Sequence, residues 1–338
     1  MRTITVALGE KTYNIEIAAG LLDQIGAKAR VLSQAVKAAI ISDSNVDPLY
    51  GERLERSLAA SGFEVTRIVF AAGEQSKNLT VLGQVYDELA RAGLTRSDLI
   101  LTLGGGVPGD LGGFAAATFL RGIDFIQVPT SLLAQIDSSV GGKVAIDLPS
   151  GKNLAGSFYQ PKAVFIDPDL LKTLPLRFLH DGLAEAIKYG CIRDAGLFAQ
   201  IAAVKSDQEL LEQADIIIET CCNIKARIVE KDEFDTGERM LLNFGHTIGH
   251  AIEKCCGFTT YTHGEGVGIG MVQMTRQTEK LGLTAAGTAE ELSRVLKKFA
   301  LPVSAVFDAQ EILQAMALDK KKSGKKINLV IIEKTGVG

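Results

Sequence analysis

Residues 98–120 read DLILTLGGGVPGDLGGFAAATFL, and this stretch decides the fold that the sequence predicts. It begins with an apolar run, residues 98–103, whose length and composition are typical of a strand buried on both faces. Three glycines follow, and a second apolar stretch from Leu111 onward has the length of a helix. A buried strand that turns through glycines into a helix is the repeating unit of a parallel α/β sheet.

The glycine-rich segment GGGVPGD, residues 104–110, has two interpretations. Backbone N–H groups at a helix N-terminus, together with the helix dipole, favour a phosphate, so the segment can bind a nucleotide pyrophosphate. Alternatively, the glycines only provide a tight turn between the strand and the helix. The spacing matches neither G-x-G-x-x-G nor G-x-x-x-x-G-K-[ST], so the two standard nucleotide fingerprints are missing.

Outward from this unit, the first half of the chain alternates strands and helices. We predict strands over residues 37–42, 64–70, 98–103, 125–129 and 163–166, and helices over 47–61 and 80–92. Residues 1–17 alternate polar and apolar side chains like a hairpin, with Gly9 near its turn. This alternation of strands and helices predicts a mostly parallel sheet with both faces covered.

From about Pro175 the pattern becomes mainly helical. We predict helices over residues 177–188, 207–230, 239–254, 266–281, 286–299 and 309–317, and one late strand over 327–333. Prolines 168 and 175 separate the two patterns. We therefore expect an α/β, Rossmann-like domain over residues 1–172 and a mainly helical domain over 173–338. Two-domain enzymes of this kind usually hold their site in the cleft between the domains.

Composition narrows the class of protein. The 338 residues suggest about two domains, and 46% hydrophobic with 22% charged residues is typical of soluble globular proteins. A net charge of −4 and the absence of tryptophan argue against a nucleic-acid partner. The N-terminus has no apolar signal region, and the apolar runs are too short to span a membrane. The five cysteines are an odd number without a disulfide-like pattern, so a cytoplasmic location fits best.

Three of the four histidines cluster in residues 242–266, LNFGHTIGHAIEKCCGFTTYTHGEG. In a helix, His246 and His250 lie one turn apart on the same face, and His263 arrives from a glycine-flanked loop. A single helical histidine is more often a satisfied structural residue, but three beside glycines favour a metal site. Cys255 and Cys256 compete as ligands, although the C-x-x-C spacing is missing.

A carboxylate for such a site is less obvious. Glu185 and Lys188, in LAEAIKYG, are three residues apart on one helical face. They can form a surface ion pair that contributes little to stability. Alternatively, Glu185 completes a site of two histidines and one carboxylate, as zinc enzymes use. The spacing alone leaves both interpretations open.

The segment 121–153, RGIDFIQVPTSLLAQIDSSVGGKVAIDLPSGKN, concentrates polar groups after a predicted strand. Thr130 and Ser131 follow that strand, at the edge where open α/β sheets bind ligands. A glycine-broken loop then carries Asp137, Lys143, Lys152 and Asn153. Taken singly, each is an ordinary solvated residue, but together they suit an anionic, polyhydroxylated substrate. The later DKKKSGKK, residues 319–326, is either a solvated basic turn or a further anion contact.

Six of these motifs, in this order, resemble those of the 3-dehydroquinate synthase family within the sugar-phosphate cyclases. They are GGGVPGDLGGFAAATFLRG, VPTSLLAQIDSSVGGKVAID, GKNLAGSFYQPKAVFID, LAEAIKYG, LLNFGHTIGHAIE and HGEGVGIGM. The resemblance covers nearly the whole chain. It implies an NAD-binding N-terminal domain, a helical C-terminal domain carrying zinc, and a homodimer. Cobalt would suit the same ligand types.

The resemblance also implies roles for individual residues. The zinc ligands would be Glu185, His246 and His263, and His250 would face the substrate. Substrate contacts would be Arg121, Asp137, Lys143, Asn153, Lys188, Lys225, Arg239, Asn243 and His250, with Lys320 or Lys321. NAD contacts would be Asp43, Glu74, Lys77, Gly105, Gly106, Asp110, Thr130, Ser131, Lys143 and Lys152. Pro108 departs from the aliphatic residue of many relatives and removes one backbone N–H from the glycine loop.

The implied substrate is 3-deoxy-D-arabino-heptulosonate 7-phosphate. Its conversion to 3-dehydroquinate and phosphate, in the shikimate pathway, would proceed by transient oxidation with NAD, phosphate elimination, re-reduction, ring opening and aldol closure. Zinc would act as a Lewis acid on a ring hydroxyl, and NAD would be regenerated in each turnover. Lys188, Asn243 and His250 are the candidates for proton handling and phosphate binding. The substrate phosphate itself is the alternative base for the elimination.

Three other functions share parts of this pattern. Metal-dependent polyol dehydrogenases have the same architecture, but an uncharged polyol does not need the five cationic residues Arg121, Lys143, Lys188, Lys225 and Arg239. Sister cyclases act on sedoheptulose 7-phosphate or glucose 6-phosphate, which lack the carboxylate that Arg239 would bind. A protein that only senses NAD and a metal ion would not need the full set of polar residues.

Overall fold

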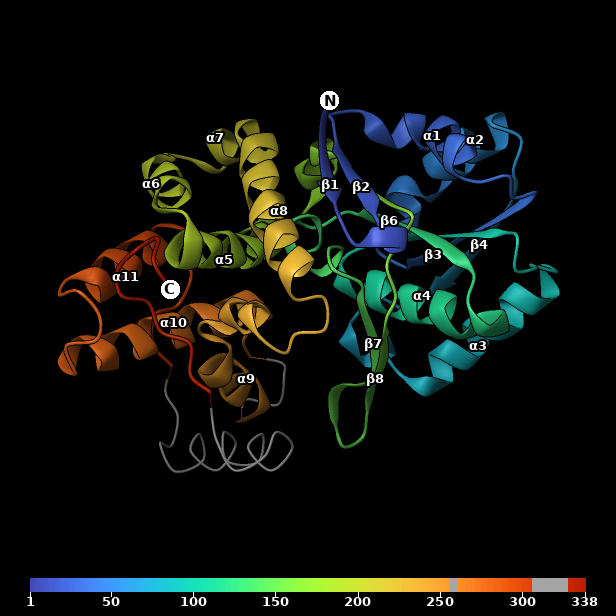
Figure 1. Cartoon of the computed structure of the whole chain (residues 1–338). Helices are drawn as coiled ribbons and strands as arrows, with labels where there is room; N and C mark the ends of the chain where they lie inside the picture. Colours follow the sequence, from blue (N-terminus) through green and yellow to red (C-terminus); the bar gives the residue numbers. More distant parts are fainter. Residues whose placement is uncertain (256–259, 306–327) are drawn as a thin grey trace. The chain divides into compact units, whose positions relative to one another are not determined.

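The computed structural model describes residues 1–255, 260–305 and 328–338, and the chain divides into two compact units (Figure 1). The first unit comprises Met1–Leu174 and Ala214–Phe234, and the second comprises Pro175–Gln213 and Asp235–Gly338. The segment Ala214–Phe234 thus belongs with the sheet, whereas a single boundary after residue 172 would have put it with the helices. No helix among the described residues is both long and apolar enough to cross a lipid bilayer.

The first unit is built on a seven-stranded sheet with the order β1-β2-β9-β6-β5-β3-β4. Every neighbouring pair is parallel except β1 and β2, which form the expected N-terminal hairpin. The bounds are β1 Arg2–Val6, β2 Tyr13–Ile17, β3 Lys37–Asp43, β4 Glu64–Phe70, β5 Leu99–Gly104, β6 Asp124–Pro129 and β9 Ala163–Ile166. The predicted mostly parallel sheet is confirmed.

Helices cover both faces of this sheet (Figure 1). The whole of β5 is buried, because Leu99 and Leu101 point to one apolar cluster and Ile100 to the other. The first cluster includes side chains of α1 (Ile25–Leu32) and α2 (Glu52–Ala60), and the second those of α3 (Leu79–Arg91) and α4 (Gly106–Thr118). Burial on both faces explains why these strands read as continuous apolar runs.

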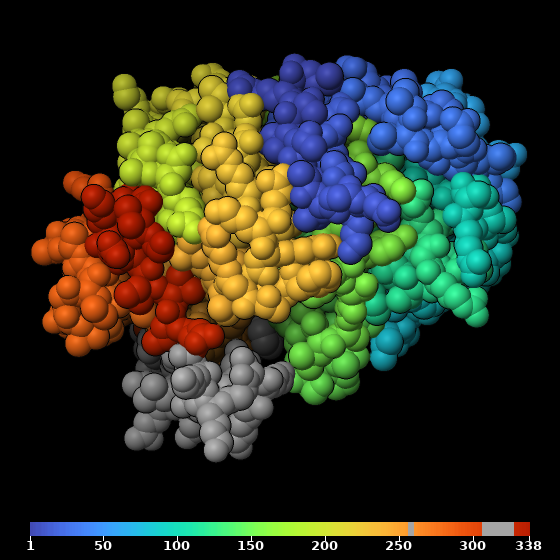
Figure 2. Space-filling model, in the orientation of Figure 1, coloured from blue at the N-terminus to red at the C-terminus, as the bar shows by residue number. Residues whose placement is uncertain are grey.

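Helix α8 (Ala214–Lys231) packs against the N-terminal strands of the same unit, and the two surfaces adjoin in Figure 2. Arg2 of β1 pairs with Glu219 and with Asp215 of α8. Farther along, the Sγ of Cys222 donates to the carbonyl of Gln135 at 3.2 Å. These contacts attach α8 to the sheet although it lies between helices of the second unit in sequence.

A second, two-stranded sheet joins β7 (Lys143–Leu148) and β8 (Gly151–Phe158). The expectation of an irregular loop over these residues was wrong. Val144 and Ile146 are buried beside α4, so this hairpin belongs to the apolar core. A Cβ at Gly156 of β8 would lie 2.4 Å from the carbonyl oxygen of Val144 in β7. The glycine permits close pairing of the strands.

The described part of the second unit is helical. Its helices are α5 Leu176–Arg193, α6 Ala195–Ala203, α7 Asp207–Glu212, the 3₁₀ helix Glu238–Asn243, α9 His246–Cys255, α10 His263–Lys280 and α11 Thr288–Lys298. The predicted helix over 207–230 is divided at Gln213 into α7 and α8. The one predicted over 239–254 is interrupted at Gly245, whose φ of +81° suits glycine.

Two further expectations concern the C-terminal part of the chain. Residues 328–333, the described part of the predicted late strand, are not a strand. Their carbonyl groups bond to a turn instead, because Ile332 accepts from the Thr284 hydroxyl and Glu333 from the Ala285 amide. The helix predicted over 309–317 lies outside the described residues.

Candidate active site

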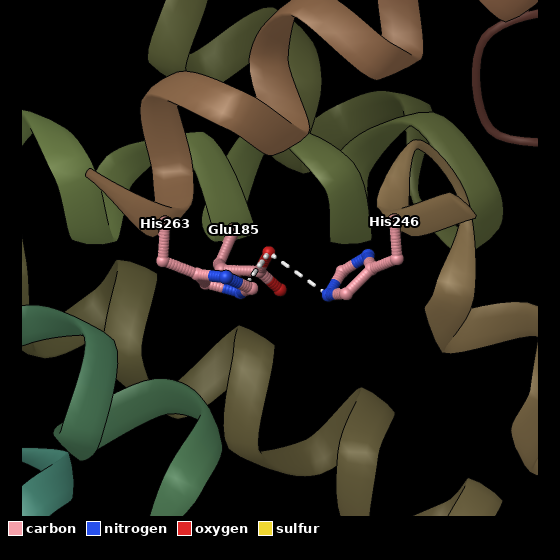
Figure 3. Close-up of side chains that lie close together, drawn as sticks. All are labelled: Glu185, His246 and His263. Carbon is pink, nitrogen blue, oxygen red and sulfur yellow. Dashed lines mark ion pairs between the residues drawn. The ribbon is translucent and has the colours of Figure 1, made fainter. Parts of the chain in front are cut away.

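Three side chains of the second unit converge on one point (Figure 3). Glu185 lies in the middle of α5, His246 is the first residue of α9, and His263 is the first residue of α10. The Oε1 atom of Glu185 lies 3.6 Å from His246 Nε2 and 3.7 Å from His263 Nε2. His263 was expected in a loop but begins a helix, with Thr262 and Glu265 forming its capping box.

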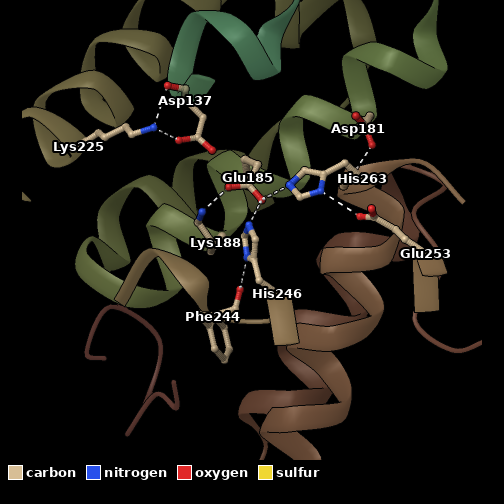
Figure 4. Close-up of polar contacts among 10 residues, drawn as sticks. Asp137, Asp181, Glu185, Lys188, Lys225, Phe244, His246, Glu253 and His263 are labelled. Carbon is tan, nitrogen blue, oxygen red and sulfur yellow. Dashed lines mark hydrogen bonds and ion pairs between the residues drawn. The ribbon is translucent and has the colours of Figure 1, made fainter. Parts of the chain in front are cut away.

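Hydrogen bonds orient all three groups (Figure 4). The ammonium of Lys188 contacts Oε2 of Glu185, which turns Oε1 toward the histidines. The Nδ1 of His246 lies 3.1 Å from the carbonyl oxygen of Phe244, and the Nδ1 of His263 lies 3.0 Å from Glu253 Oε1. If each Nδ1–H donates to its oxygen, both Nε2 lone pairs face Glu185.

Burial and neighbouring charges perturb both imidazoles. Burial, followed by the charge of Lys188, lowers the pKa of His246 well below its usual range. Burial also acts against a charge on His263, but the hydrogen bond to Glu253 and the charge of Glu185 raise its pKa to about 9. The site therefore attracts positive charge at His263 Nε2, where a metal ion would replace the proton.

This donor set fits a divalent metal ion. Ligand atoms about 2.0–2.1 Å from a tetrahedral zinc ion are separated by about 3.4 Å. The two measured separations from Glu185 Oε1 are close to that value. Glu185 and Lys188 are almost completely buried, so their contact is not a surface ion pair. One oxygen of Glu185 contacts Lys188 in a buried ion pair, and the other faces the two histidines.

The remaining predicted residues of the second unit lie on the same elements or next to them. His250 is exposed one turn after His246, with its ring centroid 5.3 Å from that of His246 and 5.9 Å from that of His263. The 3₁₀ helix Glu238–Asn243 carries Arg239, which is 1% exposed, and Asn243, which is exposed. Lys320 and Lys321 lie outside the described residues.

In the first unit, Lys225 of α8 contacts the carboxylate of Asp137 (Figure 4). Its ammonium also donates to the Asp137 carbonyl oxygen at 2.8 Å. Lys143 begins β7 and is exposed, and Arg121 is exposed with a φ of +69°. The structure thus brings Asp137 and Lys225 together.

A second polar cluster of the first unit is centred on Lys77. Its ammonium lies 2.5 Å from Asp110 Oδ2 and 2.5 Å from the side-chain oxygen of Asn153. Burial opposes the charge of Lys77, but Asp110 and Glu74 hold the pKa of the ammonium above its usual range. Lys152 directly precedes Asn153 in the chain, and its ammonium lies 3.5 Å from the carboxylate of Glu74. Lys77 and Asp110, which are predicted NAD contacts, therefore meet Asn153, which is a predicted substrate contact.

The other predicted NAD residues stand at the carboxyl ends of three adjacent strands. Asp43 ends β3, Gly105 follows β5, and Thr130 follows β6. The Thr130 amide donates to the Gly104 carbonyl at 2.9 Å, and the Ser131 hydroxyl accepts from the Ala134 amide at 3.2 Å. This edge of a parallel sheet is where open α/β folds bind their ligands.

Packing requires glycine at one position of this loop but not at the next two. A Cβ at Gly104 would lie 2.4 Å from the Pro108 ring, so packing reserves that position for glycine. A Cβ at Gly105 or Gly106 would meet only the Ser131 or Ser138 hydroxyl, at 3.4 and 3.5 Å. Packing accounts for Gly104 but not for its two neighbours, which favours the pyrophosphate interpretation. Pro108 occupies the third position of α4, within the first turn that tolerates proline.

Two residues of the site were not singled out from the sequence. Glu253 supports His263, and Asp147 accepts the Asn153 backbone N–H at 2.8 Å. A signal for Glu253 existed, because residues 246, 250 and 253 recur on one face of a helix. No comparable signal marked Asp147, since its partner is fixed only by the β7–β8 hairpin.

Comparisons with known proteins match the whole chain. Residues 67–181 match the family model described as the N-terminal part of 3-dehydroquinate synthase, and residues 182–322 match the C-terminal part. The 3-dehydroquinate synthase of Clostridium acetobutylicum is 53% identical over 99% of this chain and 95% of its own length. That of Enterococcus faecalis strain V583 is 48% identical over 98% and 93%.

Solved structures agree with this assignment. A 2-deoxy-scyllo-inosose synthase in complex with carbaglucose-6-phosphate, NAD⁺ and Co²⁺ has a TM-score of 0.89 at 25% identity, covering 99% of this chain and 93% of that one. A 2-epi-5-epi-valiolone synthase from Streptomyces hygroscopicus with NAD⁺ and Zn²⁺ has 0.84 at 28%, covering 94% and 88%. The sulfoacetaldehyde reductase of Bifidobacterium kashiwanohense, at 0.70 and 14% over 93% and 91%, shares the fold alone.

The family resemblance of the sequence motifs is therefore confirmed, as is the architecture of an α/β sheet domain with a helical domain. Identity is about twice as high to the 3-dehydroquinate synthases as to the two sister cyclases. With both parts matched by the family's models and about half of all residues shared over its full length, this chain belongs to the 3-dehydroquinate synthase family, carbon–oxygen lyases of the shikimate pathway.

Proposed function

We propose that the 3-dehydroquinate synthase activity of this chain depends on a divalent cation held by Glu185, His246 and His263. The observation that carries the proposal is the convergence of one carboxylate oxygen and two imidazole nitrogens, each already oriented by a second hydrogen bond. Zinc suits these ligand types best, and cobalt fits them as well. When bound, the cation would polarise a substrate hydroxyl as a Lewis acid.

NAD is the second proposed cofactor, and the sheet edge of the first unit is its proposed site. Gly105 and Gly106 open α4, where the first backbone N–H groups have no partner within the helix and can face a pyrophosphate. Asp43, Thr130 and Ser131 offer carboxylate and hydroxyl groups beside them. The further proposed contacts are Glu74, Lys77, Asp110, Lys143 and Lys152. When bound, NAD would accept a hydride from the substrate and return it in the same turnover.

The proposed substrate is 3-deoxy-D-arabino-heptulosonate 7-phosphate, which carries a carboxylate, hydroxyl groups and a phosphate. Arg239 is our candidate for the carboxylate, because its guanidinium can donate two parallel hydrogen bonds. The other proposed contacts are Arg121, Asp137, Lys143, Asn153 and Lys225 in the first unit, and Lys188, Asn243 and His250 in the second. Lys320 or Lys321 completes the set. This number of positively charged side chains suits a substrate with two anionic groups.

Proton handling is assigned to groups of the second unit. His250 is exposed one helical turn from His246, so its imidazole can exchange protons with a bound molecule. Lys188 is a second candidate, and its ammonium contacts Oε2 of Glu185. Asn243 can donate and accept a hydrogen bond without changing its own charge. The substrate's phosphate is the alternative base for its own elimination.

We also propose a cytoplasmic homodimer. The five cysteines support the location, since their odd number and spacing do not suit a disulfide framework and a reducing compartment keeps cysteines as thiols. Homodimerisation follows from the family resemblance. Sedimentation at several protein concentrations tests it, because a mass of one chain at all concentrations would contradict it.

A metal-reconstitution assay tests the proposed function. The protein is stripped with a chelator, reloaded with Zn²⁺ or Co²⁺, and supplied with NAD and 3-deoxy-D-arabino-heptulosonate 7-phosphate. We expect phosphate release only after reloading. Parallel reactions with sedoheptulose 7-phosphate and glucose 6-phosphate should release none, and turnover of either in preference would contradict the proposed substrate.

A further inference from the structure

The carboxylate of Glu253 is buried against the imidazole of His263. Glu253 is 3% exposed, and its Oε1 atom lies 3.0 Å from His263 Nδ1. A buried carboxylate is unfavourable unless a partner compensates for the lost hydration. Here the imidazole N–H is the partner, on the side of the ring opposite to the nitrogen that faces Glu185 (Figure 4).

Helix α9 brings this carboxylate to the metal centre by its periodicity. His246, His250 and Glu253 stand at positions i, i+4 and i+7, so one face of the helix carries all three. The three imidazole rings, including that of His263, have centroids between 5.2 and 5.9 Å apart. One face of α9 thus supplies both a ligand and the group that supports the ligand from α10.

Two glycines let α9 and α10 approach closely enough for this contact. A Cβ at Gly249 of α9 would lie 3.0 Å from the backbone of Gly266 of α10. A Cβ at Gly266 would lie 3.3 Å from the Gly249 carbonyl oxygen and 3.4 Å from Glu253 Cγ. The two helices therefore pack closely at these glycines, and a side chain at Gly249 would need a shift of the neighbouring backbone.

The two histidine ligands have different supporting groups. His246 has the neutral carbonyl of Phe244 at its Nδ1, whereas His263 has the carboxylate of Glu253. A carboxylate behind a ligating imidazole fixes the tautomer and increases the basicity of the other nitrogen. Within this cluster, Glu185 and Glu253 are both buried, and each has an oxygen that faces a nitrogen of His263.

We propose that Glu253 is a positioning residue for the metal centre: it holds the Nδ1–H form of His263 and directs the Nε2 lone pair at the cation. In this proposal Glu253 acts through the imidazole of His263 and not as a ligand. This inference rests on the proposed cation site at Glu185, His246 and His263. It adds a residue whose loss would weaken metal binding without removing a ligand.

The test compares Glu253→Ala and Glu253→Gln with the wild type and with Glu265→Gln as a matched control. Glu265 lies two residues after His263, but its carboxylate binds Arg177 at 2.8 Å and caps α10. Its variant thus removes a negative charge from the same helical turn without touching the ring. Far-ultraviolet circular dichroism and thermal unfolding of the metal-free proteins first establish that each variant folds.

Two readouts separate positioning from a general structural role. Competition with a chromogenic chelator gives the affinity for Co²⁺, and the visible spectrum of bound Co²⁺ reports its ligand geometry. We expect Glu253→Ala to bind Co²⁺ about 10–100-fold more weakly, with an altered spectrum. Glu253→Gln should recover part of the loss, because its amide oxygen still accepts the Nδ1–H. Glu265→Gln should match the wild type in both readouts.

The inference is overturned if Glu253→Ala folds and binds Co²⁺ with the affinity and the visible spectrum of the wild type. If that variant does not fold, Glu253→Gln decides, because it keeps the volume and the hydrogen bond and lacks only the charge. Wild-type Co²⁺ affinity in Glu253→Gln would then overturn it. Failure of the proposed cation site has a different signature, since the wild type and His246→Ala would then bind Co²⁺ equally poorly.

Discussion

The ammonium of Lys77 lies 2.5 Å from the side-chain oxygen of Asn153, which connects a predicted NAD contact directly to a predicted substrate contact. The same ammonium pairs with Asp110 at 2.5 Å. Asn153 has a φ of +55°, and its backbone N–H is held by Asp147. One buried cation therefore organises side chains from the loop after β4, from α4 and from β8.

Lys77→Met should destabilise the protein strongly, because it leaves the partly buried carboxylate of Asp110 without its ammonium partner. Breaking a buried ion pair by removing one partner costs about 3–5 kcal/mol. Urea unfolding gives the free energy, with Lys152→Met as the control. Lys152 pairs with Glu74 at 3.5 Å and is partly exposed, so its loss should cost at most about 1 kcal/mol. Equal effects of the two changes would contradict a special role for Lys77.

His246→Ala should abolish metal binding and activity together, since it removes one of three proposed ligands. His180→Ala is the matched control, because His180 is the fourth histidine and pairs with Asp207 at 2.7 Å instead. Metal content after dialysis, measured by atomic emission, provides the readout. Retention of a full metal equivalent by His246→Ala would exclude His246 as a ligand.

Arg239→Ala should raise KM for the carboxylate-bearing substrate and lower kcat/KM by about tenfold or more, the effect of losing a hydrogen bond to a charged group. Arg239 is almost completely buried, so Arg239→Lys is needed to separate lost charge from lost packing. Partial recovery in the lysine variant is expected. Unaltered KM and kcat in Arg239→Ala would remove Arg239 from the site.

Asp98→Asn should reduce stability in a way that depends on pH. Burial acts against ionisation of Asp98, but backbone and hydroxyl donors from Lys37 and Thr95 outweigh it and lower the carboxyl pKa. A lowered folded pKa stabilises the protein above the unfolded value, about 3.9, and this contribution disappears as pH falls through the folded value. Urea unfolding should show a gap of about 1–3 kcal/mol at pH 7 that narrows below pH 4. A gap of constant size at all pH values would contradict the assignment.

The central strands could be predicted from sequence because burial on both faces makes each of them a continuous apolar run. The β7–β8 hairpin could not, since the segment was expected to be a glycine-broken loop, and the pairing of β7 with β8 beside α4 depends on tertiary contacts. Helix boundaries at Gln213 and Gly245 were missed for a related reason. Apolar periodicity continues across Gln213 although α7 and α8 belong to different units, so the spacing alone does not mark the break.

The sequence could predict which residue types form the candidate metal centre, but not how they are arranged in space. The histidine cluster indicated His246, His250 and His263, and Glu185 was one of two open interpretations. The family resemblance then selected Glu185, His246 and His263 as the ligands. Neither could indicate that His263 begins a helix, or that Glu253 lies behind its imidazole. These details depend on the contact between Gly249 and Gly266, which are seventeen residues apart. Local sequence patterns do not predict contacts over such a separation.

The most direct test of the central claim is the stoichiometry of one reaction. Metal-loaded protein is mixed with a trace of NAD and an excess of 3-deoxy-D-arabino-heptulosonate 7-phosphate, while inorganic phosphate and NADH absorbance are followed together. A redox-neutral lyase should release many phosphates for each NAD, with no accumulation of NADH. Accumulation of NADH in proportion to product, or no release of phosphate at all, would contradict it.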